Sequence, residues 1–255
     1  MVYRWATVER VSTRVGIVWL IDKQRGVCDS QKAMPFSAEE LRDLPDIISA
    51  PRFATYLQAK GGHVADALEL YAWNAEVSAA FMVPLHLAEV AIRNAAAEAI
   101  QAVHGANWPW VNGFIRGLPR AHGRSYDAGT NLQAVAQVQP TVGKVVSELN
   151  FVFWEKVFTT SQDFKIWDQQ LWAVLPGCPG IAGGMTVAQA RAQVHADLHH
   201  VRKLRNRIAH HEPIFVRRLA DDLAVVRRLI AWRRPEAANW MDKVERVSGL
   251  LAIQP

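Results

Sequence analysis

The stretch TVAQARAQVHADLHHVRKLRNRIAHHEP, residues 186–213, predicts a long helix with a clear limit at each end. Thr186 is followed three residues later by Gln189, the spacing of a capping box that satisfies backbone N–H groups at a helix start. Pro213 disfavours helix in the residue before it, so the helix is expected to end at HHEP. One face is apolar at helical spacing and comprises Val194, Leu198, Val201, Leu204 and Ile208.

The same periodicity extends over most of the remaining chain. Apolar residues recur from Ala65 to His104, where Pro84 is expected to divide the run into two helices. Another capping box, Ser37 with Glu40, opens an earlier helix. Further helices are predicted over residues 141–160, 162–175, 218–232 and 236–251. No alternation of period two and no βαβ rhythm is found, so we expect an all-α protein with about seven to nine helices.

The chain is expected to divide into an extension and one domain. Residues 1–33 are basic and show no clear period, which leaves two interpretations: a poorly ordered N-terminal extension, or a short element docked on the domain. Met34 directly precedes the first helix and is an alternative start of the chain. Residues 34–255 are expected to form a single helical domain.

Composition favours a soluble, cytoplasmic protein. Half of the 255 residues are hydrophobic and 21% are charged, which excludes an intrinsically disordered chain. Two cysteines, Cys28 and Cys178, do not make a disulfide framework or a zinc site, and a reducing compartment follows. The longest early apolar run, residues 15–21, is too short to cross a bilayer, so no membrane association is expected.

The positive charge of the chain is concentrated in one segment. Residues 201–235 contain 10 basic and 3 acidic groups, a balance of +7, whereas the whole chain has a formal net charge of +5. Residues 34–200 contain 11 basic and 15 acidic groups, a balance of −4. A local excess of this kind indicates a polyanionic partner, and we expect RNA.

The segment 201–213 within this basic region carries groups suited to RNA cleavage without a metal. Histidine can move a proton near neutral pH, and arginine presents a fixed fork of donors to a phosphate. Arg205 and His210 are candidates for these two roles, with Asn206 orienting one of them. Five residues on a helix are separated by about 7.5 Å along the axis and about 140° around it, so a shared site would need two copies across a two-fold axis.

Two observations favour a plainer interpretation of the same residues. Arg116 and His122 repeat the approximate spacing in a loop-like stretch, so the spacing also arises by chance. His210 and His211 lie near a helix C-terminus, where cations interact favourably with the helix dipole and free carbonyls.

The sequence LRNRIAHHEPIF, residues 204–215, resembles the motif region of the Abi-like (abortive infection) family in the HEPN superfamily. Residues 53–95, which include Glu89, Arg93 and Asn94, resemble the helices at the N-terminus of that family, and residues 143–158 resemble its central helix. The resemblance extends from about Met34 to the C-terminus. It implies a HEPN-like helical bundle with additional helices and a homodimer.

The activity implied by the resemblance is a metal-independent endoribonuclease of phage-defence or toxin type, with an Arg-x4–6-His motif at the dimer interface. Arg205, Asn206 and His210 would be the motif residues, and His211 would assist. Many relatives have a basic-aromatic pattern after the histidines, whereas Glu212 follows here and would repel phosphate. An antitoxin, protein or RNA, would be a further partner. The alternative is a non-catalytic RNA-binding or interaction module of the same fold.

Other residues are expected to support the site, and no cofactor or metal is expected. Glu89, Arg93 and Asn94 would act behind Arg205, or form ordinary interhelical contacts. Residues expected to bind RNA are Arg202, Lys203, Arg207, Arg217 and Arg218. His195 and His199 have the i, i+4 spacing that can bind zinc, but no third ligand is evident, so a solvated helix face is the better interpretation.

Overall fold

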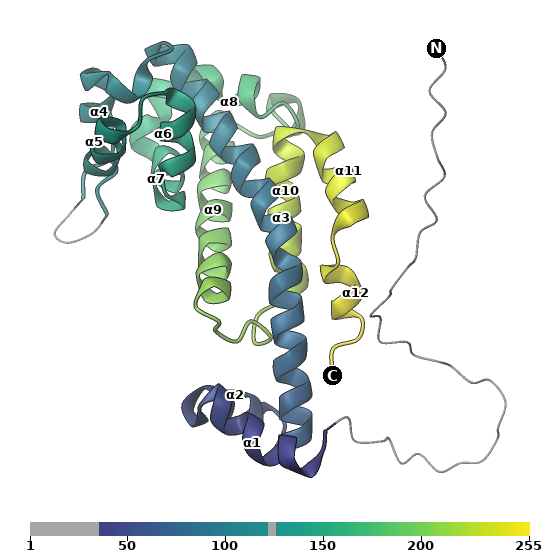
Figure 1. The fold of residues 1–255 in the computed structure, drawn as a ribbon. Helices are drawn as coiled ribbons and strands as arrows, with labels where there is room; N and C mark the ends of the chain where they lie inside the picture. Colours follow the sequence, from purple (N-terminus) through teal and green to yellow (C-terminus); the bar gives the residue numbers. More distant parts are fainter. Residues whose placement is uncertain (1–35, 122–125) are drawn as a thin grey trace, which may run out of the picture. The chain divides into compact units, whose positions relative to one another are not determined.

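The computed structural model describes residues 36–121 and 126–255, drawn in colour in Figure 1. The interpretations of residues 1–33 and of His122 lie outside the described residues. Residues Phe36–Pro255 form one compact unit. This unit is helical and contains no strand in the part that the structure describes, which confirms the all-α prediction.

The described residues contain twelve α-helices, more than the seven to nine expected. They are α1 (Ala38–Ile48), α2 (Ala50–Ala59), α3 (Val64–His104), α4 (Asn112–Gly117), α5 (Ala128–Val138), α6 (Val142–Glu148), α7 (Phe151–Val157), α8 (Asp168–Val174), α9 (Val187–Ala209), α10 (Leu219–Arg233), α11 (Pro235–Val244) and α12 (Val247–Leu251). There are more helices than expected because predicted helices are divided in the structure. The predicted helix 141–160 is divided at Asn150, whose side chain accepts a hydrogen bond from the backbone N–H of Phe153 and so starts α7.

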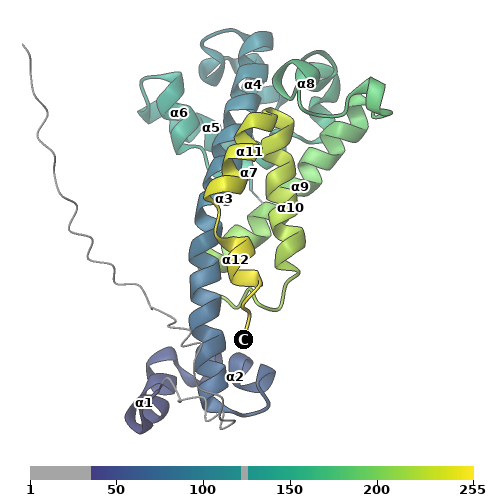
Figure 2. The same cartoon turned by 90° about the vertical axis from the view of Figure 1, so that its right-hand side faces the viewer.

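Helix α3 runs unbroken through Pro84, so the predicted division at this residue was wrong. A proline inside a helix costs about 3 kcal/mol because it removes one backbone hydrogen bond and crowds the preceding turn. Pro84 is buried, and α3 packs against α2, α10 and α12, whose contacts offset this cost. Figures 1 and 2 both show α10 and α12 lying along α3. The core around α3 includes Trp73, Phe81 and Ile92.

By length and composition α3 also meets the criteria for a membrane span, a property that core helices of soluble proteins share. This property of α3 is therefore weak evidence on whether the protein associates with membranes.

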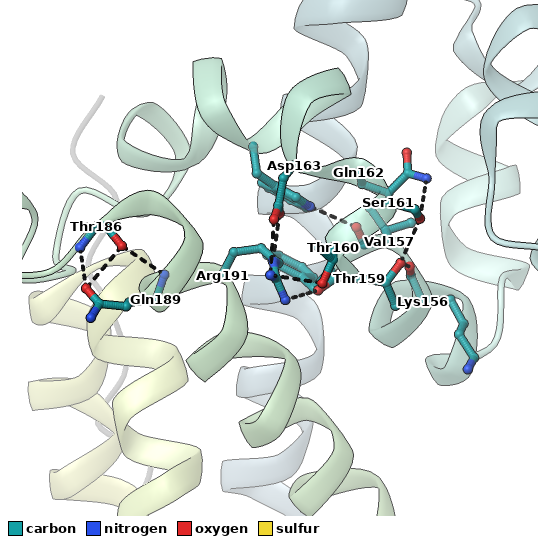
Figure 3. Close-up of polar contacts among 12 residues, drawn as sticks. Lys156, Val157, Thr159, Thr160, Ser161, Gln162, Asp163, Thr186, Gln189 and Arg191 are labelled. Carbon is teal, nitrogen blue, oxygen red and sulfur yellow. Dashed lines mark hydrogen bonds and ion pairs between the residues drawn. The ribbon is translucent and has the colours of Figure 1, made fainter.

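The predicted limits of α9 are confirmed. Thr186 accepts a hydrogen bond from the backbone N–H of Gln189 at 3.2 Å, and the Gln189 side chain accepts one from the backbone N–H of Thr186 at 2.9 Å (Figure 3). The helix ends at Ala209, directly before the two histidines. Four of the five residues predicted for its apolar face are buried and the fifth, Ile208, packs partly buried against the core.

The first half of α9 is fixed by a buried arginine. Arg191 donates to both carboxylate oxygens of Asp163, at 2.7 and 3.1 Å, and to the hydroxyl of Thr160 at 3.2 Å (Figure 3). These partners belong to the short 3-10 and π-helical turns at Thr160–Gln162 and Asp163–Trp167. Because α9 is fixed at its N-terminal end and along its buried apolar face, it is a rigid support for the motif at its C-terminal end.

Candidate functional site

The motif lies at the C-terminus of α9, where the chain turns sharply. His211 has a φ of +54°, in the left-handed region. Its backbone N–H donates to the carbonyl of Ile208, and the N–H of Glu212 donates to the carbonyl of Arg207 at 2.8 Å. This is the hydrogen-bond pattern of a Schellman motif, in which glycine usually occupies the left-handed position. Here a histidine occupies it.

A conformation in the left-handed region costs a non-glycine residue about 1–2 kcal/mol. We therefore expect His211→Gly to raise the free energy of unfolding by about 1 kcal/mol in urea titrations. The His211→Ala variant keeps the strained backbone and is the matched control. Ser49, with a φ of +77°, should gain similarly when replaced by glycine. Equal stability of the two His211 variants would contradict this account of the turn.

The loop after the histidines is held by Asn74 of α3, a residue that the sequence did not identify. Its side-chain oxygen accepts hydrogen bonds from the backbone N–H groups of Ile214 at 2.8 Å and Phe215 at 3.1 Å. The residue is 6% exposed. Arg207 holds the same loop from the other side, donating to the carbonyl of Pro213 at 2.7 Å. In the sequence, the signal for this role was a polar asparagine placed near the apolar residues Trp73 and Val77.

Arg205 is positioned by the acidic residue that the sequence placed behind it. The carboxylate of Glu89 on α3 forms an ion pair with Arg205 at 3.4 Å and a second with Arg93. The side chains of Glu89 and Arg93 are 19% and 18% exposed, whereas Arg205 is 47% exposed and free to contact a ligand. Asn94 is exposed and forms no side-chain hydrogen bond within the described residues.

The remaining motif residues face solvent. Asn206 and His210 are exposed, and no described residue forms a hydrogen bond or ion pair with either side chain. The backbone carbonyl of Asn206 accepts from the N–H of His210 at 2.9 Å, so both residues belong to the last turn. The helical geometry used to estimate the separation of Arg205 and His210 holds as far as Ala209, where the helix ends one residue before His210.

The residues predicted to bind RNA fall into two groups. Arg202 donates to the buried carboxylate of Glu155 at 2.6 Å, and Arg217 pairs with the buried Asp222 at 2.6 Å. Their charges are balanced inside the fold. Three others remain available to solvent to different degrees: Lys203 is exposed, Arg218 is 91% exposed beside Asp221, and Arg207 pairs with Glu212 at 3.6 Å.

Three other arginines of the basic segment are also paired with acids. Arg227 pairs with Asp242, Arg228 with the buried Asp197, and Arg233 with Glu98, at 2.7, 2.6 and 2.5 Å. Acidic residues outside the segment supply these partners. The local charge of +7 is therefore partly neutralised in the folded unit. Lys203 and Arg234 are exposed and form no ion pair within the described residues, and Arg205 is 47% exposed beside Glu89.

The histidine pair on α9 is partly exposed, with His199 42% exposed. Burial lowers the pKa of His195, with Glu155 opposing that shift. The ring nitrogen Nδ1 of His199 lies 3.1 Å from the carboxylate of Glu155 and the same distance from Arg202. Within residues 36–121 and 126–255, no group of three or more metal-ligating side chains is present. The pair belongs to a partly exposed polar cluster around the buried carboxylate of Glu155.

Comparisons with known proteins do not assign the chain. No family model, no curated protein and no solved structure matches it. Its function therefore has to be inferred from the site.

Proposed function

We propose that the protein is a metal-independent endoribonuclease of phage-defence or toxin type, whose active site combines Arg205 and His210 from two copies of the chain. The observation that supports this most is the last turn of α9. There an exposed arginine, paired with Glu89, precedes an exposed histidine whose side chain has no partner among the described residues. This arrangement leaves one phosphate-binding group and one proton-transfer group exposed at the same helix end.

The chemistry is an internal displacement at phosphorus. The ribose 2′-oxygen attacks the adjacent phosphorus, the bond from phosphorus to the 5′-oxygen breaks, and a 2′,3′-cyclic phosphate and a 5′-hydroxyl result. His210 takes the proton of the 2′-hydroxyl or gives one to the leaving oxygen. Arg205 stabilises the charge that develops on the non-bridging oxygens. Asn206 positions these groups, and His211 assists.

Charge around Arg205 is compatible with phosphate binding. One carboxylate, Glu89, is shared by two guanidinium groups, Arg93 and Arg205, which leaves the cluster positive. Glu89 restricts the arginine side chain, and a group that is ordered before binding loses less conformational entropy when it binds. Glu89 and Arg93 are therefore positioning residues.

A second copy is needed because one helix end does not focus both side chains on a single atom. Exposed apolar residues of α3 near Glu89 provide a surface for that copy: Val83 and Val90 are 45% and 37% exposed. An isologous dimer places the same surface on both chains, so two equivalent composite sites form.

The proposal is tested by the products of RNA cleavage in EDTA. The protein is expected to cut single-stranded RNA and to leave 2′,3′-cyclic phosphate ends, detected by mass spectrometry. The same sequence with 2′-O-methyl groups should remain intact because the attacking hydroxyl is blocked. Cleavage of the methylated strand, or cleavage that stops in EDTA, would contradict the mechanism.

The alternative is a non-catalytic RNA-binding or interaction module. One observation favours it: Glu212 lies beside the motif and pairs with Arg207, which removes a cation from the surface. This alternative predicts RNA binding that weakens steeply with salt and no turnover. Intact RNA after prolonged incubation with a protein that binds it would select this function.

A further inference from the structure

A groove of about 540 Å³ opens next to the motif, between α2, α3 and the end of α9. In Figure 1, α2 lies at one end of α3, and the loop after α9 runs toward the same end. Tyr71, Met82 and Ile208 contribute to its walls, and His211 lies at its edge. The volume falls within the range of small-ligand sites, and the mixture of aromatic, apolar and polar walls is typical of them.

Tyr56 lines this groove, and its hydroxyl is buried with no hydrogen-bond partner among the described residues. The residue as a whole is 0% exposed. Burial raises the pKa of Tyr56 to about 12, with Tyr71 adding to the shift and Arg52 opposing it, so the phenol stays protonated and can donate. Buried polar groups are almost always hydrogen-bonded, and a ligand atom in the groove would give this hydroxyl a partner.

A second buried group in the groove has donors to spare. The side-chain oxygen of Asn74 is used by the backbone N–H groups of Ile214 and Phe215, which fixes the orientation of the amide. No described residue accepts a hydrogen bond from its NH₂ group. Asn74 therefore offers only donors to a ligand, and it is 6% exposed.

Cationic and titratable groups border the same groove. Arg52 is exposed, and no described carboxylate lies within ion-pair distance of it. His211, in the turn that ends α9, adds an exposed imidazole. An aromatic pocket with buried donors and a cation at its edge fits a planar base attached to a phosphate.

We propose that this groove binds one nucleotide, with its base against Tyr71 and Asn74 and its phosphate toward Arg52. The donors of Tyr56 and Asn74 favour O6 of guanine or O4 of uracil, at the ring position where adenine and cytosine carry an amino group. The groove is a nucleotide site whether or not the protein cleaves RNA. Its further role, selecting the base at the cleavage point, rests on the proposed function.

The first test is calorimetric binding of the 5′-monophosphates of guanosine, uridine, adenosine and cytidine to the full chain. Oligomers of 2′-O-methyl uridine and 2′-O-methyl adenosine, which the proposed mechanism does not cleave, form the second arm. Tighter binding of the uridine oligomer than of uridine monophosphate identifies an RNA strand as the ligand source. Binding of the monophosphates alone identifies a free nucleotide. Either result supports the site.

The decisive variant is Tyr56→Phe, which removes only the buried hydroxyl. We expect it to weaken binding of the preferred nucleotide about tenfold, the effect of one lost hydrogen bond in a buried site, and to leave protein stability undiminished. Tyr126→Phe is the matched control, because the Tyr126 hydroxyl donates to Asn131 at 2.7 Å, away from the groove. That variant should lose stability and bind nucleotides as the wild type does.

The outcomes separate this site from the proposed nuclease. Three results would overturn the nucleotide site even if RNA is cleaved. They are no binding by any probe, equal binding of all four bases, and a Tyr56→Phe variant that binds as tightly as the wild type. Failure to cleave RNA with Tyr56-dependent binding would instead overturn only the nuclease. A groove covered by a second copy would show no nucleotide binding and would also overturn the site.

Discussion

Replacement of His210 by alanine is expected to lower the rate of RNA cleavage by about 10²–10⁴-fold, the usual contribution of a general acid or base. The Arg205→Ala variant is expected to lose about 10²–10³-fold, as when one donor to a developing oxyanion is removed. Neither side chain is buried, so neither substitution should unfold the protein. Initial rates on a labelled single-stranded RNA in EDTA measure both effects.

Two exposed residues elsewhere are matched controls for this pair. His63 precedes α3 and its side chain makes no capping hydrogen bond, and Arg116 lies on the surface of α4. Their alanine variants should cleave RNA at the wild-type rate. Loss of activity in all four variants would indicate a general effect of surface charge, and unchanged rates for Arg205→Ala and His210→Ala would remove both residues from the active site.

The Asp222→Ala variant is expected to lower the free energy of unfolding by about 3 kcal/mol, the lower end of the range for a broken buried pair. The Asp222 carboxylate is 2% exposed and binds Arg217 and His200, joining the loop after the motif to α9 and α10. Its removal leaves Arg217 unpaired at a site that is only 18% exposed. Urea titration followed by circular dichroism measures the loss.

The adjacent residue provides the control for this prediction. Asp221 lies in the same first turn of α10, but it is 63% exposed and pairs with Arg218, which is 91% exposed. Exposed pairs contribute about 0–1 kcal/mol, so Asp221→Ala should change stability little. Similar losses for Asp221→Ala and Asp222→Ala would show that the helix dipole, rather than the buried cluster, dominates at this position.

Local signals in the sequence were sufficient for the elements that carry the motif. The capping box at Thr186 and the proline after HHEP predicted both limits of α9, because caps and breakers act on a few neighbouring residues. Pro84 shows where such local signals fail. Its effect on the helix depends on packing against α10 and α12, which are more than a hundred residues away in the chain.

The charge pattern could be interpreted only in part. The excess of arginine in residues 201–235 is plain from the sequence, but its partners Glu155, Asp197 and Glu98 come from earlier segments. The contact between Glu89 and Arg205 was anticipated as one of two alternatives and is present. The role of Asn74 depends on a contact across 140 residues, which no local pattern announces.

The central claim is that one active site takes Arg205 from one copy and His210 from another. Co-expression of Arg205→Ala and His210→Ala chains with different tags allows the mixed dimer to be purified. One of its two sites would be intact and the other would lack both groups, so the mixed dimer should cleave RNA at about half the wild-type rate. Recovery of no mixed dimer, or of a mixed dimer as inactive as either parent variant, would contradict the claim.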